Sequence, residues 1–178
     1  DFWDALINGR CGIGKITRFD ASEYRTQIAG EVKDFDFSGY MNPKDAKRLD
    51  LFCQYAIAAS DEAMATAGLP KDLRGSEIDP NRVGVIVSSG IGGLATMSDQ
   101  DRVLLERGPG RISPFLIPMM IGDIASGNIS MRYGAGGPNM GLVTACSTGT
   151  HSIGESFWAI KRDDADIMIC GGTEATIV

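Results

Sequence analysis

Two runs of nearly continuous apolar residues are the strongest pattern in the chain. One covers residues 82–88 and the other residues 166–170, and turn residues bound both of them. A third candidate covers residues 139–144. Runs of this kind are typical of strands that are buried on both faces, in a sheet that lies between helices. The pattern therefore predicts an α/β fold.

Apolar residues at spacings of three and four predict a helix before the first of these strands. Asn42 offers an N-cap, Pro43 suits the first helical position, and Gly68 suits the end of the element. One apolar face is expected, made of Leu51, Phe52, Tyr55, Ala56, Ala59, Ala63 and Met64.

Two further helices are predicted near the other strands. One covers residues 117–133 and has isoleucines on its inner side, although Gly122 and Gly127 disfavour a helix interior unless another helix packs very close there. The second covers about residues 147–162 and joins the candidate strand at 139–144 to the strand at 166–170. A strand, a helix and a strand in succession predict a crossover unit in a parallel or mixed sheet.

The two ends of the chain differ from this pattern. Residues 9–40 contain glycine-rich turns and short alternating segments, which are typical of a peripheral hairpin. The chain begins at Asp1 within a predicted helix and stops at Val178 soon after a strand. We therefore expect residues 1–178 to be one piece of a larger domain, truncated at both ends.

The composition argues against several classes of protein. The chain has 178 residues, of which 43% are hydrophobic, and this is enough for a core. The formal net charge of -6 argues against nucleic acid as a partner, because phosphate binding needs a surplus of Lys and Arg on one face. The four cysteines form no C-x-x-C pair, which favours a reducing cytoplasm. No apolar run reaches the ~18 residues of a membrane span, so no membrane is expected as a partner.

Cys146 lies where a predicted strand ends and a predicted helix begins. The positive end of the helix dipole and the free N–H groups of the first turn favour a thiolate over a thiol. Ala145, Ser147, Thr148 and Gly149 are all small, which leaves room for an acyl group and for backbone N–H groups beside its carbonyl oxygen. The arrangement is that of a nucleophile elbow with sulfur as the nucleophile.

The alternative for this cysteine is a structural role. Cysteine is among the most buried residue types, and a single cysteine at a strand end usually packs in a core. Cys170, in the middle of a predicted strand, illustrates that case, and Cys11 and Cys53 are also expected to be structural. The small residues and the helix start beside Cys146 favour the catalytic interpretation for that residue.

His151 is the only histidine and is not expected to form a dyad with Cys146. Five residues along a helix turn the side chain by about 500°, so the two side chains point roughly 140° apart. Any catalytic base must therefore come from elsewhere.

The remaining polar and glycine-rich segments predict no cofactor or metal site. Residues 88–93 follow a strand and resemble a phosphate cradle, but they lack the G-K-[ST] ending of that motif. No spacing of His, Cys, Asp and Glu suggests a metal site. Asp163, Asp164, Asp166 and Glu174 are interpreted as solvated loop and strand-end charges.

Four separated motifs give the chain a family resemblance. They are Val143-Thr-Ala-Cys-Ser-Thr-Gly-Thr-His-Ser-Ile-Gly154, Asp164-Ala-Asp-Ile-Met-Ile-Cys-Gly-Gly-Thr-Glu-Ala175, Ser88-Ser-Gly-Ile-Gly-Gly93 and Gly110-Arg-Ile-Ser-Pro-Phe115. Together they resemble the beta-ketoacyl-acyl-carrier-protein synthases, most closely the synthase II branch of fatty-acid biosynthesis. The resemblance covers the whole chain and implies a thiolase-like fold of α/β/α/β/α layers, of which these residues are roughly the first half.

The resemblance also implies an activity and the residues that carry it. Cys146 is expected to take an acyl group from acyl-ACP and to pass it to malonyl-ACP in a decarboxylative Claisen condensation, without a cofactor. Gly90, Ile91 and Ala145 match residues that line the acyl pocket. Leu116 and Ile117 match residues that reach the pocket across a homodimer. The acidic carrier protein is expected to contact Lys47, Arg48 and Arg111, although exposed basic residues are usually only solvated.

The resemblance places the other catalytic groups outside this stretch. Two histidines, a lysine and the second oxyanion donor of the family lie beyond Val178, so residues 1–178 alone are expected not to catalyse condensation. Three alternatives remain: a ketosynthase domain of a polyketide synthase, a non-catalytic partner of the same fold, and a degradative thiolase-like enzyme. The run Ser-Thr-Gly-Thr-His after Cys146 argues against the first, the presence of the cysteine argues against the second, and the context around the cysteine is a poor match to the third.

Overall fold

The computed structural model describes residues 2–178, which form two compact units. The smaller unit comprises the segment up to Asp36 together with Ile177–Val178. It contains helix α1 (Phe2–Ile7) and an antiparallel pair of strands, β1 (Ile13–Lys15) and β2 (Ile28–Gly30). The pair lies within the range for which the sequence predicts a peripheral hairpin.

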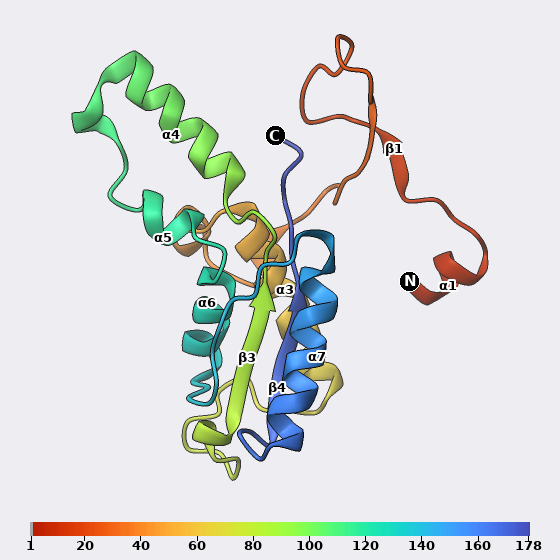
Figure 1. Ribbon diagram of the computed structural model, residues 1–178, viewed down its shortest axis with the longest axis vertical. Coiled ribbons are helices and arrows are strands. Elements are labelled where there is room, and N and C mark those ends of the chain that lie inside the picture. The colour runs from red at the N-terminus through yellow and green to blue at the C-terminus, as the bar shows by residue number, and fades with distance from the viewer. Residues whose placement is uncertain (1) are drawn as a thin grey trace. The chain divides into compact units, whose positions relative to one another are not determined.

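The larger unit, Phe37–Thr176, is built on a parallel pair of strands (Figure 1). Strand β3 (Val83–Ser88) pairs along its whole length with β4 (Ile167–Gly172), and Val83 lies opposite Ile167. All six residues of β3 are buried, as the apolar run predicts. In β4 only Ile169 is buried, so the prediction of a strand covered on both faces is wrong for β4 within this chain.

The third predicted strand is reduced to a single bridge between Asn139 and Val85. Beyond Asn139, serine hydroxyls replace a β-ladder. Ser126 Oγ donates to the Met140 carbonyl, and the Leu142 N–H donates to Ser88 Oγ. These side-chain bonds satisfy the backbone without a regular strand, which explains the difference from the prediction.

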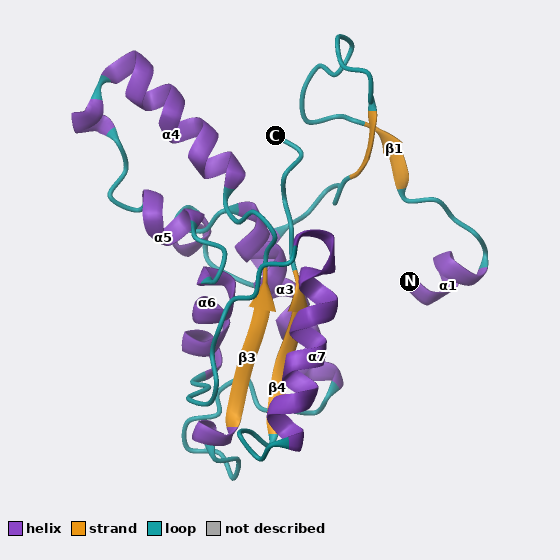
Figure 2. Ribbon diagram, viewed as in Figure 1, coloured by secondary structure: helices purple, strands orange, loops and turns teal. Residues whose placement is uncertain are grey.

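Helices cover both faces of the strand pair (Figure 2). Val83, Val85 and Val87 share a core with residues of helices α3 (Leu51–Thr66) and α6 (Ile124–Tyr133). Because successive side chains of a strand alternate between its faces, Gly84, Ile86 and Ser88 point to the other face, against helix α7 (Thr148–Lys161). The predicted helix at about 147–162 is therefore confirmed.

The helix predicted after Asn42 is interrupted. Asn42 caps helix α2 (Pro43–Ala46), and its Oδ1 accepts hydrogen bonds from the N–H groups of Lys44 and Asp45. A new helix, α3, then begins after a second N-cap at Asp50. Ala59 and Ala63, predicted on the inner face, are exposed, and the buried positions of α3 are instead Phe52, Cys53, Ala56, Ile57, Ala58, Ser60 and Met64.

The helix predicted at residues 117–133 is also divided, into α5 (Leu116–Met120) and α6. The break surrounds Gly122, and the Gly93 N–H donates to the Met120 carbonyl at the end of α5. The loop after β3 thus supplies the hydrogen bond that a continuous helix would have made.

Helix α4 (Leu94–Arg107) follows that loop and, with α5, projects from the end of the strand pair in Figure 1. Short 3-10 turns complete the unit: Phe37–Gly39, Pro80–Arg82, Pro109–Arg111 and Ala145–Ser147. Among residues 2–178, no helix combines the length and the apolar character that crossing a membrane requires.

Candidate active site

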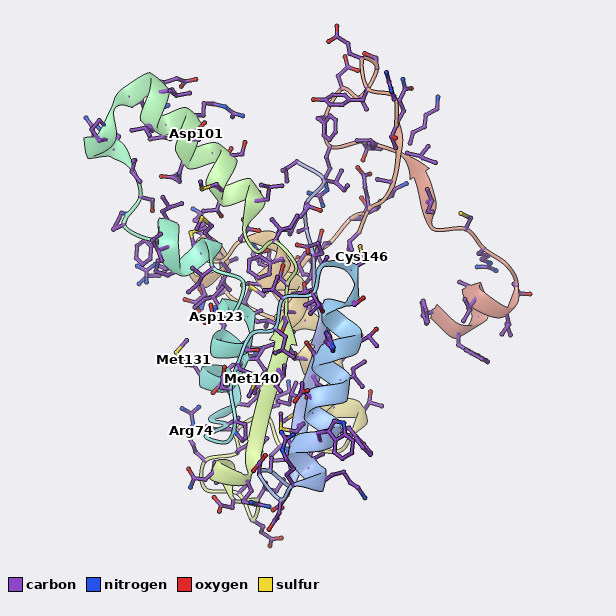
Figure 3. The ribbon with its side chains drawn as sticks, viewed as in Figure 1. Arg74, Asp101, Asp123, Met131, Met140 and Cys146 are labelled. Carbon is purple, nitrogen blue, oxygen red and sulfur yellow. The ribbon has the colours of Figure 1, made fainter. Side chains whose placement is uncertain are left out.

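Cys146 lies in the 3-10 turn Ala145–Ser147, directly before the first residue of α7. The Ser147 N–H donates to the Thr144 carbonyl, and the Thr148 N–H donates to the Ala145 carbonyl. The side chain of Cys146 is exposed. Figure 3 places it at the N-terminal end of α7, at the edge where β3 and β4 end. The predicted strand-to-helix position of this cysteine is thus replaced by a loop-to-helix position with the same relation to the helix dipole.

The backbone is strained next to the cysteine. Ala145 has a φ of 52°, in the left-handed region that residues with a side chain seldom occupy. Such a conformation costs on the order of 1–3 kcal/mol and persists only where the surroundings enforce it. Here the buried Thr148 does so, because its Oγ1 accepts a hydrogen bond from the Thr144 N–H at 2.9 Å. The tight turn directs Cys146 away from the core.

A close backbone contact fixes the start of α7 against the end of β4. A Cβ on Gly172 would lie 2.8 Å from the Cα of Gly149 and 3.1 Å from its N. No side chain fits on Gly172, so glycine at this position lets helix and strand approach this closely. The contact lies three residues after Cys146 and therefore sets its position over the sheet.

A cavity of about 520 Å³ opens beside the cysteine. Its lining includes Cys146, Ala145, Gly90 and Ile91, four residues that the sequence predicts for the site. Gly90 and Ile91 come from the loop after β3, more than fifty positions before the other two in the sequence. The cavity is large enough for a small ligand group.

The other predicted residues lie outside this cavity. Leu116 and Ile117 are on α5, and Ile117 is exposed. Lys47 and Arg48 follow α2, and the Arg48 guanidinium lies 4.8 Å from the centre of the Phe115 ring. Arg111 ends the 3-10 turn Pro109–Arg111.

His151 makes a local contact on α7. Its Nδ1 lies 2.9 Å from Thr144 Oγ1, and the ring is exposed. In the part of the chain that the structure describes, no group of three or more His, Cys, Asp or Glu residues is placed to hold a metal ion.

The other cysteines differ from Cys146 in their surroundings. Cys53 is buried in α3, and burial, together with the nearby charge of Asp50, raises the pKa of its thiol well above the ordinary value. A thiol held in its neutral form is a poor nucleophile. Cys170 and Cys11 are exposed, so the expectation that Cys170 is packed in a strand interior is wrong within this chain.

Glu174 and Ser89 are site residues that the sequence did not predict. Glu174 lines the cavity, and its carboxylate accepts hydrogen bonds from Ser89 Oγ at 2.9 Å and from the Gly90 N–H at 3.0 Å. Glu174 is exposed, in line with its interpretation as a solvated strand-end charge, but that interpretation did not include these two hydrogen bonds. A usable signal was present, because residues that directly follow two neighbouring parallel strands meet at the same edge of a sheet.

Comparison with known proteins places this geometry in a family. The model of the beta-ketoacyl synthase N-terminal domain matches residues 1–178. The 3-oxoacyl-[acyl-carrier-protein] synthase 2 of Synechocystis sp. is 48% identical over 99% of this chain and 42% of its own length. The protein of the same name from Staphylococcus aureus is 47% identical over 98% of this chain and 41% of its own length. The chain thus spans about two fifths of these relatives.

Solved structures share the fold. A chain in the structure of the ishigamide ketosynthase/chain length factor matches 97% of this chain over 42% of its own length, with a TM-score of 0.82 and 28% identity. The solved structure of a type II PKS acyl-carrier protein in complex with its ketosynthase contains a chain that matches 81% of this chain over 40% of its own length, with a TM-score of 0.72 and 27% identity. These neighbours confirm the expected thiolase-like α/β fold class. The chain therefore belongs to the beta-ketoacyl synthase family and corresponds to its N-terminal domain.

Proposed function

We propose that the complete protein is a 3-oxoacyl-ACP synthase of fatty-acid biosynthesis and that Cys146 is its acyl-accepting nucleophile. The observation that carries the proposal is the position of Cys146, exposed on a strained turn before α7 and beside a cavity of about 520 Å³.

The first half of the proposed reaction is an acyl transfer. The Cys146 thiolate attacks the carbonyl carbon of acyl-ACP, a new C–S bond forms, and the carrier thiol leaves and takes up a proton. The acyl chain then occupies the cavity lined by Gly90, Ile91 and Ala145.

The second half is a decarboxylative condensation. Malonyl-ACP loses CO₂, and the resulting carbanion attacks the carbonyl of the Cys146 thioester. The C–S bond breaks, the thiolate returns to Cys146, and 3-oxoacyl-ACP is released. His151, the only histidine in the chain, faces Thr144. The groups that promote decarboxylation are therefore assigned to parts of the protein outside these residues, and residues 1–178 alone are expected not to condense.

We assign these residues to the amino-terminal half of a larger thiolase-like domain. The exposed face of α7 carries Ile153, Phe157 and Trp158, each more than half exposed. An apolar surface of this kind needs cover in a stable protein. The coverage of about two fifths of the relatives' length supports the same assignment.

The acyl carrier protein is the proposed partner, in a cytoplasmic homodimer. Lys47, Arg48 and Arg111 are exposed and positively charged, which suits an acidic carrier. Exposed apolar residues on α4 and α5, among them Leu105 and Ile117, support a second copy as the surface that covers this region, with Leu116 and Ile117 reaching its pocket.

A polyketide ketosynthase is the second candidate, because the solved structure of a type II PKS acyl-carrier protein with its ketosynthase shares the fold at a TM-score of 0.72. Sequence identity separates the two. The 3-oxoacyl-[acyl-carrier-protein] synthase 2 relatives are 47–48% identical, whereas the type II PKS structure is 27% identical. The fatty-acid function is therefore favoured.

The experiment is intact-mass analysis of the complete protein after incubation with acyl-ACP, beside Cys146→Ala. We expect one acyl adduct on the peptide that contains Cys146, and no adduct in the variant. Cys170→Ala is the matched control, because Cys170 is also exposed, and it should be acylated like the wild type. No adduct in the wild type, or an adduct that persists in Cys146→Ala, would refute the proposal.

A further inference from the structure

The loop after β3, residues 89–92, is held by one carboxylate from the end of β4. Ser89 Oγ donates to Glu174 Oε1, and the Gly90 N–H donates to Glu174 Oε2. Ser89 Oγ also accepts a hydrogen bond from the Gly92 N–H at 2.8 Å. Ser89 is 1% exposed, so its hydroxyl is shielded from solvent and links Glu174 to Gly92 on the other side of the loop. Both carboxylate oxygens are thus engaged by the same loop.

This loop needs such an anchor. It contains Gly90 and Gly92, and Gly92 has a φ of 83°, so its backbone is intrinsically freer than that of other residues. The side chain of Ile91 is 61% exposed and therefore has little packing to hold it. The position of Ile91 at the cavity depends on the backbone bonds on either side of it.

The same loop touches the elbow that carries the nucleophile. A Cβ on Gly90 would lie 2.9 Å from Glu174 Oε2 and 3.4 Å from the Ala145 carbonyl oxygen. Gly90 is thus enclosed between the carboxylate and the residue before Cys146. Because the two oxygens of Glu174 bind Ser89 and Gly90 at the same time, its carboxylate is placed to fix this distance.

We infer that Glu174 is a positioning residue of the acyl pocket: with Ser89 as a relay, it holds residues 89–92 against the Cys146 elbow and so sets which acyl chains reach the nucleophile. The inference rests on the proposed function. Glu174 acts through Gly90 and Ile91 and takes no part in bond making or breaking.

The test uses the complete protein with Glu174→Ala and Glu174→Gln, and with Glu77→Gln as a control at an exposed carboxylate before β3. Acylation of Cys146 is followed by mass spectrometry with butyryl-ACP and with myristoyl-ACP. For Glu174→Ala we expect the ratio of the long-chain to the short-chain rate to change by about tenfold, the scale of pocket-based discrimination. Alkylation of Cys146 by iodoacetamide, a reagent too small to need the pocket, should keep its wild-type rate.

Glu174→Gln should retain part of the anchoring of the loop, so its acylation ratio should change less than that of Glu174→Ala. Its amide oxygen can accept from the Gly90 N–H while its NH₂ donates to Ser89 Oγ, so the loop keeps two of its bonds but loses the charge. This variant also keeps the test decisive if Glu174→Ala fails to fold.

Hydrogen exchange of the peptide that contains residues 89–93 gives a readout that needs no substrate. We expect faster exchange in Glu174→Ala than in the wild type and in Glu77→Gln. Unchanged exchange, or an equal fall in both acylation rates, would overturn the inference. If the wild type accepts neither acyl group, the proposed function fails, and the exchange comparison still decides whether Glu174 holds the loop.

Discussion

Replacing Gly172 by alanine tests whether the contact between β4 and α7 positions the nucleophile. The new Cβ would lie 2.8 Å from the Cα of Gly149, a backbone atom that cannot rotate away. Carbon atoms in contact are normally about 3.5–4.0 Å apart, so strand and helix must separate by roughly 1 Å. Overpacking of this kind costs about 1–3 kcal/mol of folding free energy.

The substitution should also slow the reaction of Cys146. Cys146 lies three residues before Gly149, so a shift of the helix start moves the sulfur relative to the cavity. A displacement of about 1 Å can lower a rate by roughly 10²-fold. The assay is the rate of acyl transfer from acyl-ACP to Cys146 in the complete protein, measured beside urea unfolding.

Gly154→Ala is the matched control. Gly154 is on the same helix, and a Cβ there would meet no atom within 4 Å. Because alanine favours a helix more than glycine does, this variant should gain about 0.5–1 kcal/mol in stability and keep its acylation rate. If Gly172→Ala were acylated as fast as the wild type, the contact would not position Cys146 and the reasoning would be wrong.

Two further predictions concern hydrogen bonds and buried groups in the larger unit. Asp50→Ala removes the buried acceptor of the Thr96 N–H at 2.9 Å and of Thr96 Oγ1 at 2.6 Å, so the free energy of unfolding should fall by about 3 kcal/mol. Loss of the exposed cap in Asn42→Ala should cost only about 1 kcal/mol. Urea unfolding of the complete protein compares the two variants, and equal costs would contradict this account. Burial, and to a smaller extent the hydrogen bond to Asp61, raise the pKa of Tyr133 above its ordinary value of 10.0. The contribution of Tyr133 to stability is therefore complete below pH 10.0 and is lost as the pH rises further. In Tyr133→Phe the free energy of unfolding should fall less steeply above pH 10.0 than in the wild type, and an identical slope would assign the alkaline loss of stability to other groups.

The sequence predicts the regular elements well where one physical signal dominates. The apolar run at β3 and the helical spacing of α7 both match the structure, because burial decides those segments. The helix expected at residues 117–133 is divided because the Gly93 N–H, far away in sequence, binds the Met120 carbonyl. A tertiary hydrogen bond of this kind leaves no local pattern to detect.

The candidate site was predictable in part for the same reason. Cys146 and its small neighbours form a local pattern, and Gly90 and Ile91 were identified through the family resemblance. Glu174 was missed because its role depends on a pairing between β3 and β4, which brings it to Ser89 across eighty-five positions. The burial of β4 was overestimated because an apolar run indicates that a strand is covered but does not indicate whether the covering residues belong to the same chain.

The left-handed backbone of Ala145 has a consequence for engineering. Glycine at this position would relieve about 1–2 kcal/mol of steric conflict, so a screen that selects only for thermal stability should favour Ala145→Gly. The same exchange would widen the range of conformations open to the turn that presents Cys146. Stability and preorganisation therefore pull in opposite directions at this residue, and a designer who wants a heat-resistant catalyst should leave it unchanged.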